Sequence, residues 1–551
     1  MKNRLQLLIC TAILLVAVGG SAMAQLRSVK SSKKITAELY EVVDITIEAR
    51  GEVENPFEVE LMANFLSPCG ESQSIPAFYN GAREWVVRFS GNEPGEWSYQ
   101  ISSADKNFKA QSGKVTVSST PYLGLKGGVV VSKENPGKFA RESGEGFFLM
   151  GFEADFLFAL DYGSESGTPQ LDGVLSKIER ERFNYVVMNV YAYDLEWKKD
   201  ERFEDLPHYN FGGREEMFPF LGSNSEPDYS GLNVEFFEKL DRTIYKLYER
   251  DIVSHLMIYV WSDHIAWPEL TGIEGNRYFD YVVKRYQAFP NVVWDISKEA
   301  LGYQRVTADF VTERIDRLRG LDSYGRLLTV HDYRYCGAYP DKVDFIVKQD
   351  WDYRYYPNML ELGRRHPDKP CVNIENGGYE RSDYLIYDNG NYDDAETCLG
   401  RNYAALFAGA YSTYYWQGMA WHIMIYDWFE AGVSEYRPKT QYYRYMSEFF
   451  EKYSYETLRP EPKFNSSGYC MTDDRGLYVF YLPRGSRKAE TYKLRDVAEG
   501  AILYCWFNPL TGEYTDECRA EDFASFKMPE SPWYMHGDAI FIMQTTLKEN
   551  N

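Results

Sequence analysis

After its N-terminal segment, the sequence lacks any hydrophobic run long enough to cross a membrane. Residues 5–18 are mostly apolar, but this stretch is short for a span, and no later stretch reaches about 18 apolar residues. Lys2 and Arg4 precede the stretch, and residues 22–24 (Ala-Met-Ala) follow it, a pattern typical of a secretory signal peptide. We therefore expect a signal peptide over residues 1–24, a secreted or periplasmic protein, and no membrane span.

Cysteine is scarce and dispersed. Of 8 cysteines, Cys10 lies in the predicted signal peptide, and the others form no Cys-x-x-Cys pair, which argues against a zinc site of that type. Cys505 and Cys518 are close enough in the chain to pair across a hairpin. Asp263 and His264 resemble metal ligands, but no third ligand follows at a suitable spacing. We expect neither a metal nor another cofactor.

Positive charge is also in short supply. The chain has 60 Lys and Arg against 82 Asp and Glu, a formal net charge of −22. Such a surface repels nucleic acids and anionic membranes, so we expect no nucleic-acid partner. Aromatic residues are abundant at 16%, and they either fill a core or line a groove where sugar rings stack. The sequence leaves the oligomeric state open.

The N-terminal part of the chain reads as all-β. Over residues 33–118, apolar and polar residues alternate in runs such as 35–40, 43–49, 57–63 and 85–89. Turn residues such as those at 91–95 separate the runs, which is typical of a β-sandwich. This segment holds no constellation of catalytic residues.

From about residue 140 the pattern alternates between strands and helices. Eight strand-like runs are expected at residues 146–152, 185–191, 255–261, 291–296, 327–331, 345–350, 371–375 and 412–417. Amphipathic helical segments, such as residues 234–247, separate them. Eight strands alternating with helices predict a (β/α)₈ TIM barrel over residues 140–453. The pattern returns to β over residues 455–548, which predicts a C-terminal β-sandwich and a multidomain protein.

Two glutamates lie at the carboxyl ends of predicted barrel strands. Glu299 follows the fourth strand, and Glu375 ends the seventh. The carboxyl ends of barrel strands line the active site, and paired carboxylates there are the equipment of a glycoside hydrolase. One protonates the leaving oxygen, and the other attacks the sugar or activates water. We therefore expect a carbohydrate substrate, with Glu299 and Glu375 as catalytic residues.

The layout resembles that of clan A retaining glycoside hydrolases, and residues 146–155 (Gly-Phe-Phe-Leu-Met-Gly-Phe-Glu-Ala-Asp) are similar to the opening of apiosidase-like barrels. The resemblance implies that Glu299 is the acid/base and Glu375 the nucleophile of a double displacement. In that clan an Asn that binds the sugar 2-hydroxyl precedes the acid/base, whereas this chain has Lys298. A lysine there is expected to lower the pKa of Glu299, unless the ammonium points into the groove and binds a carboxylated sugar. We therefore expect a preference for anionic glycans.

Further residues after the barrel strands are candidates for substrate binding. Asp155, Asn189, Tyr191, His331, Tyr333, Gln349 and Trp351 follow strands one, two, five and six, and the resemblance maps a stacking Trp onto Trp416 after strand eight. His331 has a second interpretation, because it can orient Glu375 or be an ordinary hydrogen-bonded barrel histidine. A long insertion over residues 195–233 is expected to shape the groove.

Other classes of function stay open from the sequence. The barrel could be a catalytically inactive glycan-binding scaffold, for which Lys298 is the main support, or a polysaccharide lyase with a Tyr, His or Lys base. A Ser-His-Asp esterase is disfavoured because the chain has no Gly-x-Ser-x-Gly motif. The sugar, its linkage, and endo or exo action are not encoded in any motif that we recognise.

Overall fold

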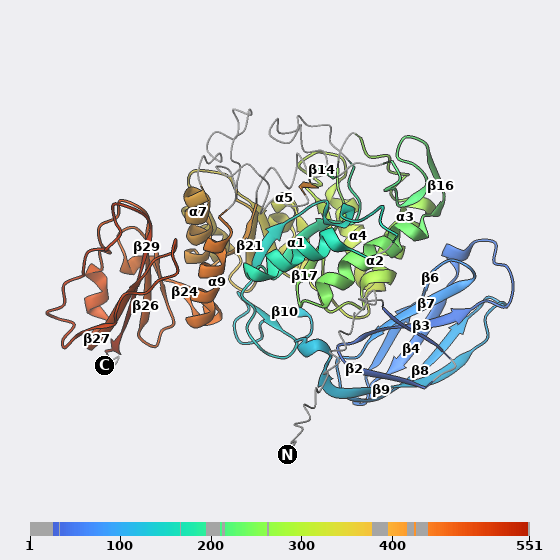
Figure 1. Ribbon diagram of the computed structural model, residues 1–551, viewed down its shortest axis with the longest axis horizontal. Helices are drawn as coiled ribbons and strands as arrows, with labels where there is room; N and C mark the ends of the chain where they lie inside the picture. Colours follow the sequence, from blue (N-terminus) through green and yellow to red (C-terminus); the bar gives the residue numbers. More distant parts are fainter. Residues whose placement is uncertain are drawn as a thin grey trace, which may run out of the picture.

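The computed structural model describes residues 26–31, 34–165, 167–193, 210–211, 215–261, 264–376, 395–415, 424–425 and 439–548. Figure 1 shows an N-terminal β-domain in blue and a C-terminal β-domain in orange to red on opposite sides of a central barrel. The predicted multidomain architecture, a (β/α)₈ barrel flanked by two β-domains, is confirmed. The predicted signal peptide lies outside the described residues.

The N-terminal domain is a sandwich of a four-stranded and a five-stranded sheet, in the orders β1-β3-β7-β6 and β2-β9-β8-β4-β5. The apolar residues that alternate along its strands, among them Ile45, Trp85 and Trp97, fill the space between the two sheets. The strands are β1 (Arg27–Lys30), β2 (Ile35–Leu39), β3 (Val42–Glu48), β4 (Leu61–Leu66), β5 (Ser72–Pro76), β6 (Phe78–Tyr79), β7 (Glu84–Ser90), β8 (Gly95–Ser103) and β9 (Gln111–Pro121).

The barrel is an eight-stranded parallel sheet in the order β19-β18-β17-β13-β12-β22-β21-β20. The Asp344 N–H donates to the Leu328 carbonyl at 2.8 Å and the Thr329 hydroxyl to the Phe345 carbonyl at 3.0 Å, which joins the two edges. The strands are β12 (Met150–Glu153), β13 (Tyr185–Asn189), β17 (Val253–Tyr259), β18 (Val292–Lys298), β19 (Leu328–His331), β20 (Ile346–Gln349), β21 (Cys371–Glu375) and β22 (Tyr411–Tyr414).

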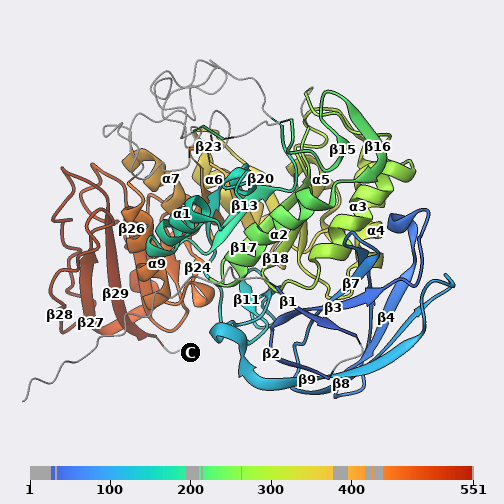
Figure 2. The same cartoon turned by 45° about the vertical axis from the view of Figure 1, so that its right-hand side comes forward.

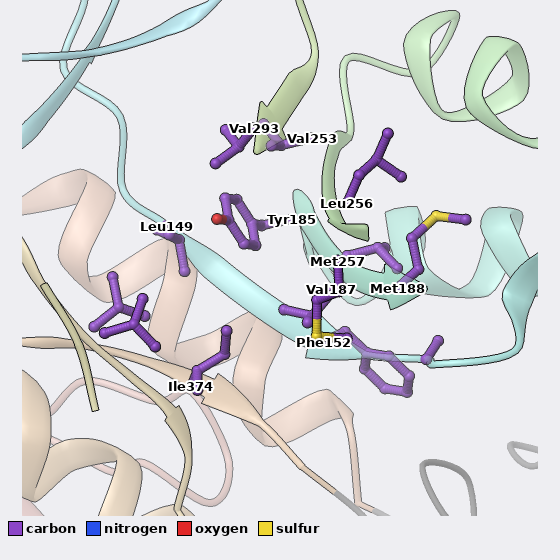
Figure 3. Close-up of a cluster of buried hydrophobic side chains, with 14 of the residues drawn as sticks. Leu149, Phe152, Tyr185, Val187, Met188, Val253, Leu256, Met257, Val293 and Ile374 are labelled. Carbon is purple, nitrogen blue, oxygen red and sulfur yellow. The ribbon is translucent and has the colours of Figure 1, made fainter. Parts of the chain in front are cut away.

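Helices surround the barrel, as the alternating pattern predicts. The helices are α1 (Pro169–Arg180), α2 (Val234–Tyr248), α3 (Ile273–Tyr286), α4 (Ala308–Leu321), α5 (Tyr333–Ala338), α6 (Tyr355–Arg365), α7 (Ala395–Phe407) and α9 (Gln441–Lys452). Strands β17 and β18 are buried along their whole length, because helices cover one face and the barrel interior the other. Figure 3 shows part of the buried cluster, with Phe152, Val187 and Ile374 from three different strands.

Short hairpins accompany the barrel. Strands β10 (Val129–Val131) and β11 (Phe139–Arg141) precede it, and β15 (Phe220–Gly222) pairs with β16 (Pro227–Leu232) inside the predicted insertion. Strand β14 (Asn210–Phe211), also in the insertion, pairs with β23 (Met424–Ile425) after strand eight. The insertion therefore meets the segment that follows β22. None of the described helices is long and apolar enough to be a membrane-spanning candidate.

The C-terminal domain differs from the expected sandwich, because its described strands form a single six-stranded sheet. Phe480 and Phe541 face the domain's own core, while Tyr481 stacks on Tyr403 of α7, with ring centroids 5.3 Å apart. The barrel helices α7 and α9 thus pack on one face of this sheet (Figure 2), and the domain's own core lies on the other face. The strands are β24 (Arg459–Pro460), β25 (Cys470–Thr472), β26 (Leu477–Leu482), β27 (Ala498–Phe507), β28 (Cys518–Ala520) and β29 (Ala539–Leu547).

The disulfide that we considered between Cys505 and Cys518 is not formed, since both thiols are free. In the ladder between β27 and β28, Cys518 is opposite Tyr504 rather than Cys505. Neighbouring residues of a strand point to opposite faces, so the Cys505 side chain is directed away from Cys518. A shift of one residue in register therefore separates the two sulfurs.

Candidate active site

Glu375 is the last residue of β21 and is fully buried. Gln349 ends the neighbouring strand β20 and is the register partner of Glu375, and its side-chain amide donates to Glu375 Oε2 at 2.6 Å. On the other carboxylate oxygen, Lys298 Nζ lies 3.0 Å and His331 Nε2 3.3 Å from Oε1. Four strand ends, those of β18, β19, β20 and β21, thus hold one carboxylate in place.

These neighbours control the pKa of Glu375. Burial alone would raise it, but the positive charge of Lys298, together with the hydrogen bonding and charge of His331, lowers the pKa to about 2. The carboxylate is therefore ionised throughout the ordinary range of pH. An ionised and oriented carboxylate suits a nucleophile, which must donate electron density to the sugar.

Lys298 is surrounded by carboxylates and is only 2% exposed. Its ammonium donates to Glu153 Oε1 at 2.6 Å and to Asp155 Oδ2 at 3.3 Å, in addition to its contact with Glu375. Burial opposes the charged form, but Asp155, Glu153 and Glu375 raise the pKa of Lys298 well above its usual value. The expectation that this ammonium points into the groove to bind a sugar carboxylate is therefore corrected: its partners are protein carboxylates.

The pKa values of the other two carboxyl groups of this cluster, Glu153 and Asp155, are shifted in the opposite direction to that of Glu375. Burial raises the pKa of Glu153 well above its usual value, and it raises that of Asp155 as well, although Lys298 opposes both shifts. One ammonium cannot compensate three buried negative charges, so the cluster favours a proton on Glu153 or Asp155. Asp155 is 3% exposed, and its contact is with Lys298 inside this cluster.

Glu299 follows Lys298 at the end of β18 and is partly exposed. Its φ is +51°, a left-handed conformation that is uncommon for a residue other than glycine. Its N–H donates to the carbonyl of His331 at 2.8 Å, just beyond an irregularity in the ladder between β18 and β19. The strand end is thus turned at Glu299, so that successive residues do not simply alternate between the two faces.

The pKa of Glu299 is raised, contrary to the lowering that we expected from Lys298. Burial raises it most and the charge of Glu375 adds to this, whereas Lys298, His331 and a hydrogen bond from Tyr303 oppose the shift. A carboxyl with a raised pKa keeps its proton to higher pH, as a general acid requires. The charge of Lys298 does lower the pKa of Glu299, but burial and the charge of Glu375 raise it by more.

Among the remaining candidates for substrate binding, Asn189 and Trp351 lie near the strand ends of the barrel. Asn189 ends β13 and is 2% exposed, and its Oδ1 has no hydrogen-bond partner among the described residues. Trp351 is partly exposed two residues beyond Gln349, and its ring centroid lies 5.9 Å from that of Tyr415. Trp416 lies outside the described residues, as does Asp263. These observations keep Asn189 and Trp351 as candidates near the strand ends.

Two further expected substrate contacts, Tyr191 and Tyr333, differ in their surroundings. Tyr191 is fully buried, its hydroxyl donates to Asn224 at 2.8 Å, and its ring packs on Phe218 and Trp267. Tyr333 begins α5, and its ring contacts Lys348 and His366. The expectation for Tyr191 is corrected, because a hydrogen bond and aromatic packing bury its side chain, whereas Tyr333 is half-buried and stays a candidate.

Sequence reasoning missed Glu153 and Tyr303. Glu153 and Asp155 are two residues apart at the end of β12, and alternation along a strand places such residues on one side. That spacing was a usable signal. Tyr303 follows Glu299 by four residues, in a turn where the Tyr303 N–H donates to the Glu299 carbonyl at 3.0 Å, and no periodic pattern marks it. No group of three or more His, Cys, Asp or Glu in the described ranges is arranged to hold a metal ion.

Comparisons with known proteins agree with this fold. The model of the "apiosidase-like, catalytic domain" family matches residues 135–457, more than half of the chain. The model of a "domain of unknown function" (DUF5060) matches residues 36–104, in the N-terminal sandwich. No curated protein matches the chain at a significant level.

Solved structures of glycoside hydrolases share the architecture at low identity. A crystal structure of a candidate glycoside hydrolase from Bacteroides vulgatus ATCC 8482 is 17% identical, with a TM-score of 0.70, and the match covers 93% of this chain and all of the other. A family 5 glycoside hydrolase from the same strain is 16% identical, with a TM-score of 0.54 and coverage of 76% and 93%. At these identities the matches establish the fold.

Proposed function

The chain belongs to the apiosidase-like family of catalytic domains, and we propose that it is a secreted glycoside hydrolase that cleaves an oligosaccharide or polysaccharide with retention of configuration. Its fold is that of glycoside hydrolases. The observation that carries the proposal is the opposite displacement of two pKa values: that of Glu375 is lowered to about 2, while that of Glu299 is raised. Two carboxyl groups whose pKa values are shifted in opposite directions are suited to different roles, one as the acid and the other as the nucleophile.

In the proposed mechanism, Glu299 protonates the glycosidic oxygen while ionised Glu375 attacks the anomeric carbon. The bond to the leaving group breaks and a covalent glycosyl–Glu375 ester forms. Glu299, now deprotonated, takes a proton from water, which attacks the anomeric carbon and releases Glu375. Two inversions give net retention.

Lys298 and His331 act in this mechanism as positioning residues for Glu375. They hold its Oε1 from one side while Gln349 holds Oε2, so the carboxylate enters the reaction already oriented. The replacement of Asn by Lys298 was the main support for an inactive glycan-binding barrel. Because Lys298 binds the proposed nucleophile, this replacement is compatible with catalysis. A lysine kept charged by three carboxylates is also a poor base, which disfavours a lyase that uses Lys298.

A screen of the purified protein against soluble plant and algal glycans, with released sugars as the readout, tests the proposal. Wild type is expected to release sugar from at least one glycan, and Glu375→Gln from none. Proton NMR of the first-formed product is expected to show the anomer of the substrate. Turnover by Glu375→Gln equal to wild type would refute the catalytic role, and an inverted first product would refute retention.

A further inference from the structure

A cavity of about 520 Å³ lies between the barrel and the C-terminal domain, and none of the groups described above explains it. Barrel residues Tyr353, Glu396 and Arg401 line one side, and Tyr469, Arg484 and Asp538 of the C-terminal domain line the other. We propose that this cavity, which we call the interdomain pocket, binds a neutral glycosyl unit of a glycan chain. The inference rests on the proposed function in one respect, that the ligand is a glycan.

Arg401 connects the interdomain pocket to the strand ends of the candidate active site. The Arg401 side chain extends from α7 to the ends of β21 and β20. There its Nε donates to the Asn376 carbonyl at 2.8 Å and its Nη2 to the Asp350 carbonyl at 3.0 Å. Asn376 directly follows Glu375, and Asp350 directly follows Gln349. A residue that lines the pocket therefore also holds the turns that follow the proposed nucleophile and its amide partner, which connects the pocket wall to these two strand ends.

The chemistry of the pocket wall suits a sugar. Tyr353 is 74% exposed and Tyr469 is half-buried, whereas Tyr356 and Tyr481 are almost completely buried and support Tyr469, with ring centroids 4.3 Å and 5.4 Å from its ring. Tyrosine combines a flat apolar face with a hydroxyl at its edge, which matches the apolar face and polar edge of a pyranose or furanose ring. The pocket thus offers both kinds of contact.

The charged groups of the pocket favour a neutral ligand. Asp538 is already engaged, because its Oδ2 accepts from the Tyr481 hydroxyl at 2.5 Å and its Oδ1 from the Arg484 N–H at 2.8 Å. Glu396 and Asp538 are balanced by Arg401 and the exposed Arg484 side chain, so the lining carries no net charge. Side chains of both signs can bind paired sugar hydroxyls, and a lining without excess positive charge offers no net attraction to the carboxylate of a uronic acid.

Affinity electrophoresis of the full chain tests the inference, with Glu375→Gln as the background so that the polysaccharide stays intact. The gels contain arabinoxylan, galactomannan, xyloglucan or, as the acidic probe, polygalacturonate. At least one neutral polysaccharide is expected to retard the protein. Tyr353→Ala and Arg484→Ala are each expected to weaken the apparent Kd roughly tenfold, the value of one lost ring contact or charge-assisted hydrogen bond.

Tyr339→Ala is the matched control, because Tyr339 is an exposed tyrosine of the barrel that does not line the pocket. It is expected to be retarded like the background protein. Equal retardation of Tyr353→Ala, Arg484→Ala and the control would overturn the inference, as would stronger retardation by polygalacturonate than by every neutral polysaccharide, or no retardation by any neutral one. Pocket-dependent retardation together with absent turnover in wild type would instead refute only the proposed hydrolase.

Discussion

Lys298 Nζ lies 3.0 Å from Glu375 Oε1 and, at the same time, 2.6 Å from Glu153 Oε1. Lys298, at the position where the sequence resemblance leads one to expect a sugar-binding Asn, is therefore the buried counter-ion of the proposed nucleophile. A charge in this position has an energetic cost, which is offset only because several carboxylates surround it. The arrangement ties the ionisation of Glu375 to residues from β12 and β18.

The first prediction concerns the two catalytic carboxyls. Glu375→Gln and Glu299→Gln keep the shape of the side chain but remove the nucleophile or the transferable proton. Each is expected to lower kcat on a natural glycan by at least about 10³-fold, within the range typical of such groups. Steady-state rates of sugar release measure this, with circular dichroism to verify folding. A loss under tenfold in either variant would contradict its assignment.

Small anions distinguish the two roles. In Glu375→Ala, azide can enter the space of the lost carboxylate and attack the sugar, which is expected to give a glycosyl azide of inverted configuration from an activated aryl glycoside. In Glu299→Ala the covalent intermediate still forms, so azide is expected to give a glycosyl azide of retained configuration. NMR of the products reads the configuration, and the reverse pattern would exchange the two assignments.

Lys298→Met is expected to move the pH–activity profile of kcat/KM to higher pH. Activity rises with pH as Glu375 ionises and falls as Glu299 loses its proton. Lys298 lowers the pKa of both carboxyls, so its removal raises both. The acid limb, set in wild type by a pKa of about 2, is expected to enter the measurable range.

Gln349→Leu is the comparison for that variant, because Gln349 contacts the same carboxylate without a charge. It is expected to lower kcat/KM while moving the acid limb much less than Lys298→Met. Identical profiles for Lys298→Met and wild type would show that Lys298 has only a packing role.

The positions of Glu299 and Glu375 were predictable from the sequence for a definite reason. Parallel barrel strands are covered on both faces, so runs such as residues 291–296 and 371–374 are mostly apolar, apart from Asn291, Asp295 and Asn373, and the charged residues that follow them mark the strand ends. The alternation with amphipathic helices then gives the barrel, which brings all strand ends together.

The roles of Lys298 and Tyr191 were not predictable in the same way. Whether a side chain at a strand end points to the groove or into the protein depends on partners from distant segments. Lys298 meets Glu153 from 145 positions earlier in the chain, and Tyr191 meets the ring of Phe218 in the insertion. The left-handed turn at Glu299 also changes the direction of the strand end, and the sequence gives no glycine to signal it.

The junction between the N-terminal domain and the barrel gives a stability prediction. Arg88 of β7 is 1% exposed, and it binds Asp44 of its own sandwich at 2.8 Å and Asp241 of α2 at 3.0 Å. Arg88→Met leaves Asp44 buried without its partner, which is expected to cost about 3 kcal/mol in the unfolding of the N-terminal domain. Urea denaturation measures the change.

The matched control for Arg88→Met is Lys114→Met, in the other sheet of the sandwich. Lys114 and Glu96 form an ion pair whose side chains are both more than half exposed, and such a pair contributes little to stability. Its loss is expected to change the free energy of unfolding by under about 0.5 kcal/mol. Equal effects of the two substitutions would show that Arg88 does not join the domains.

The last prediction concerns Asp295, a fully buried residue of β18 beneath the candidate site. Its Oδ1 accepts from the N–H groups of Ser297 and His331, both at 2.9 Å, and its Oδ2 lies 2.8 Å from His255 Nε2. Asp295→Ala leaves these three donors without an acceptor, and each buried unpaired group costs about 1–3 kcal/mol. The backbone N–H groups belong to the strand ends that place Lys298 and His331 around Glu375. We therefore expect a loss of at least about 3 kcal/mol in stability, together with reduced kcat.

Asp295→Asn separates the hydrogen bonds of this residue from its charge. The Asn Oδ1 can still accept from both backbone N–H groups, and its Nδ2 can donate to His255 Nε2 if the proton of that ring moves to Nδ1, where it faces the Tyr185 hydroxyl. Burial lowers the pKa of His255, which favours the neutral ring that this exchange needs. The Asn variant is thus expected to retain most of the stability and activity that the Ala variant loses. Differential scanning calorimetry and sugar release compare the two, and equally large losses in both would show that the negative charge of Asp295, rather than its two backbone hydrogen bonds, holds the strand ends in place.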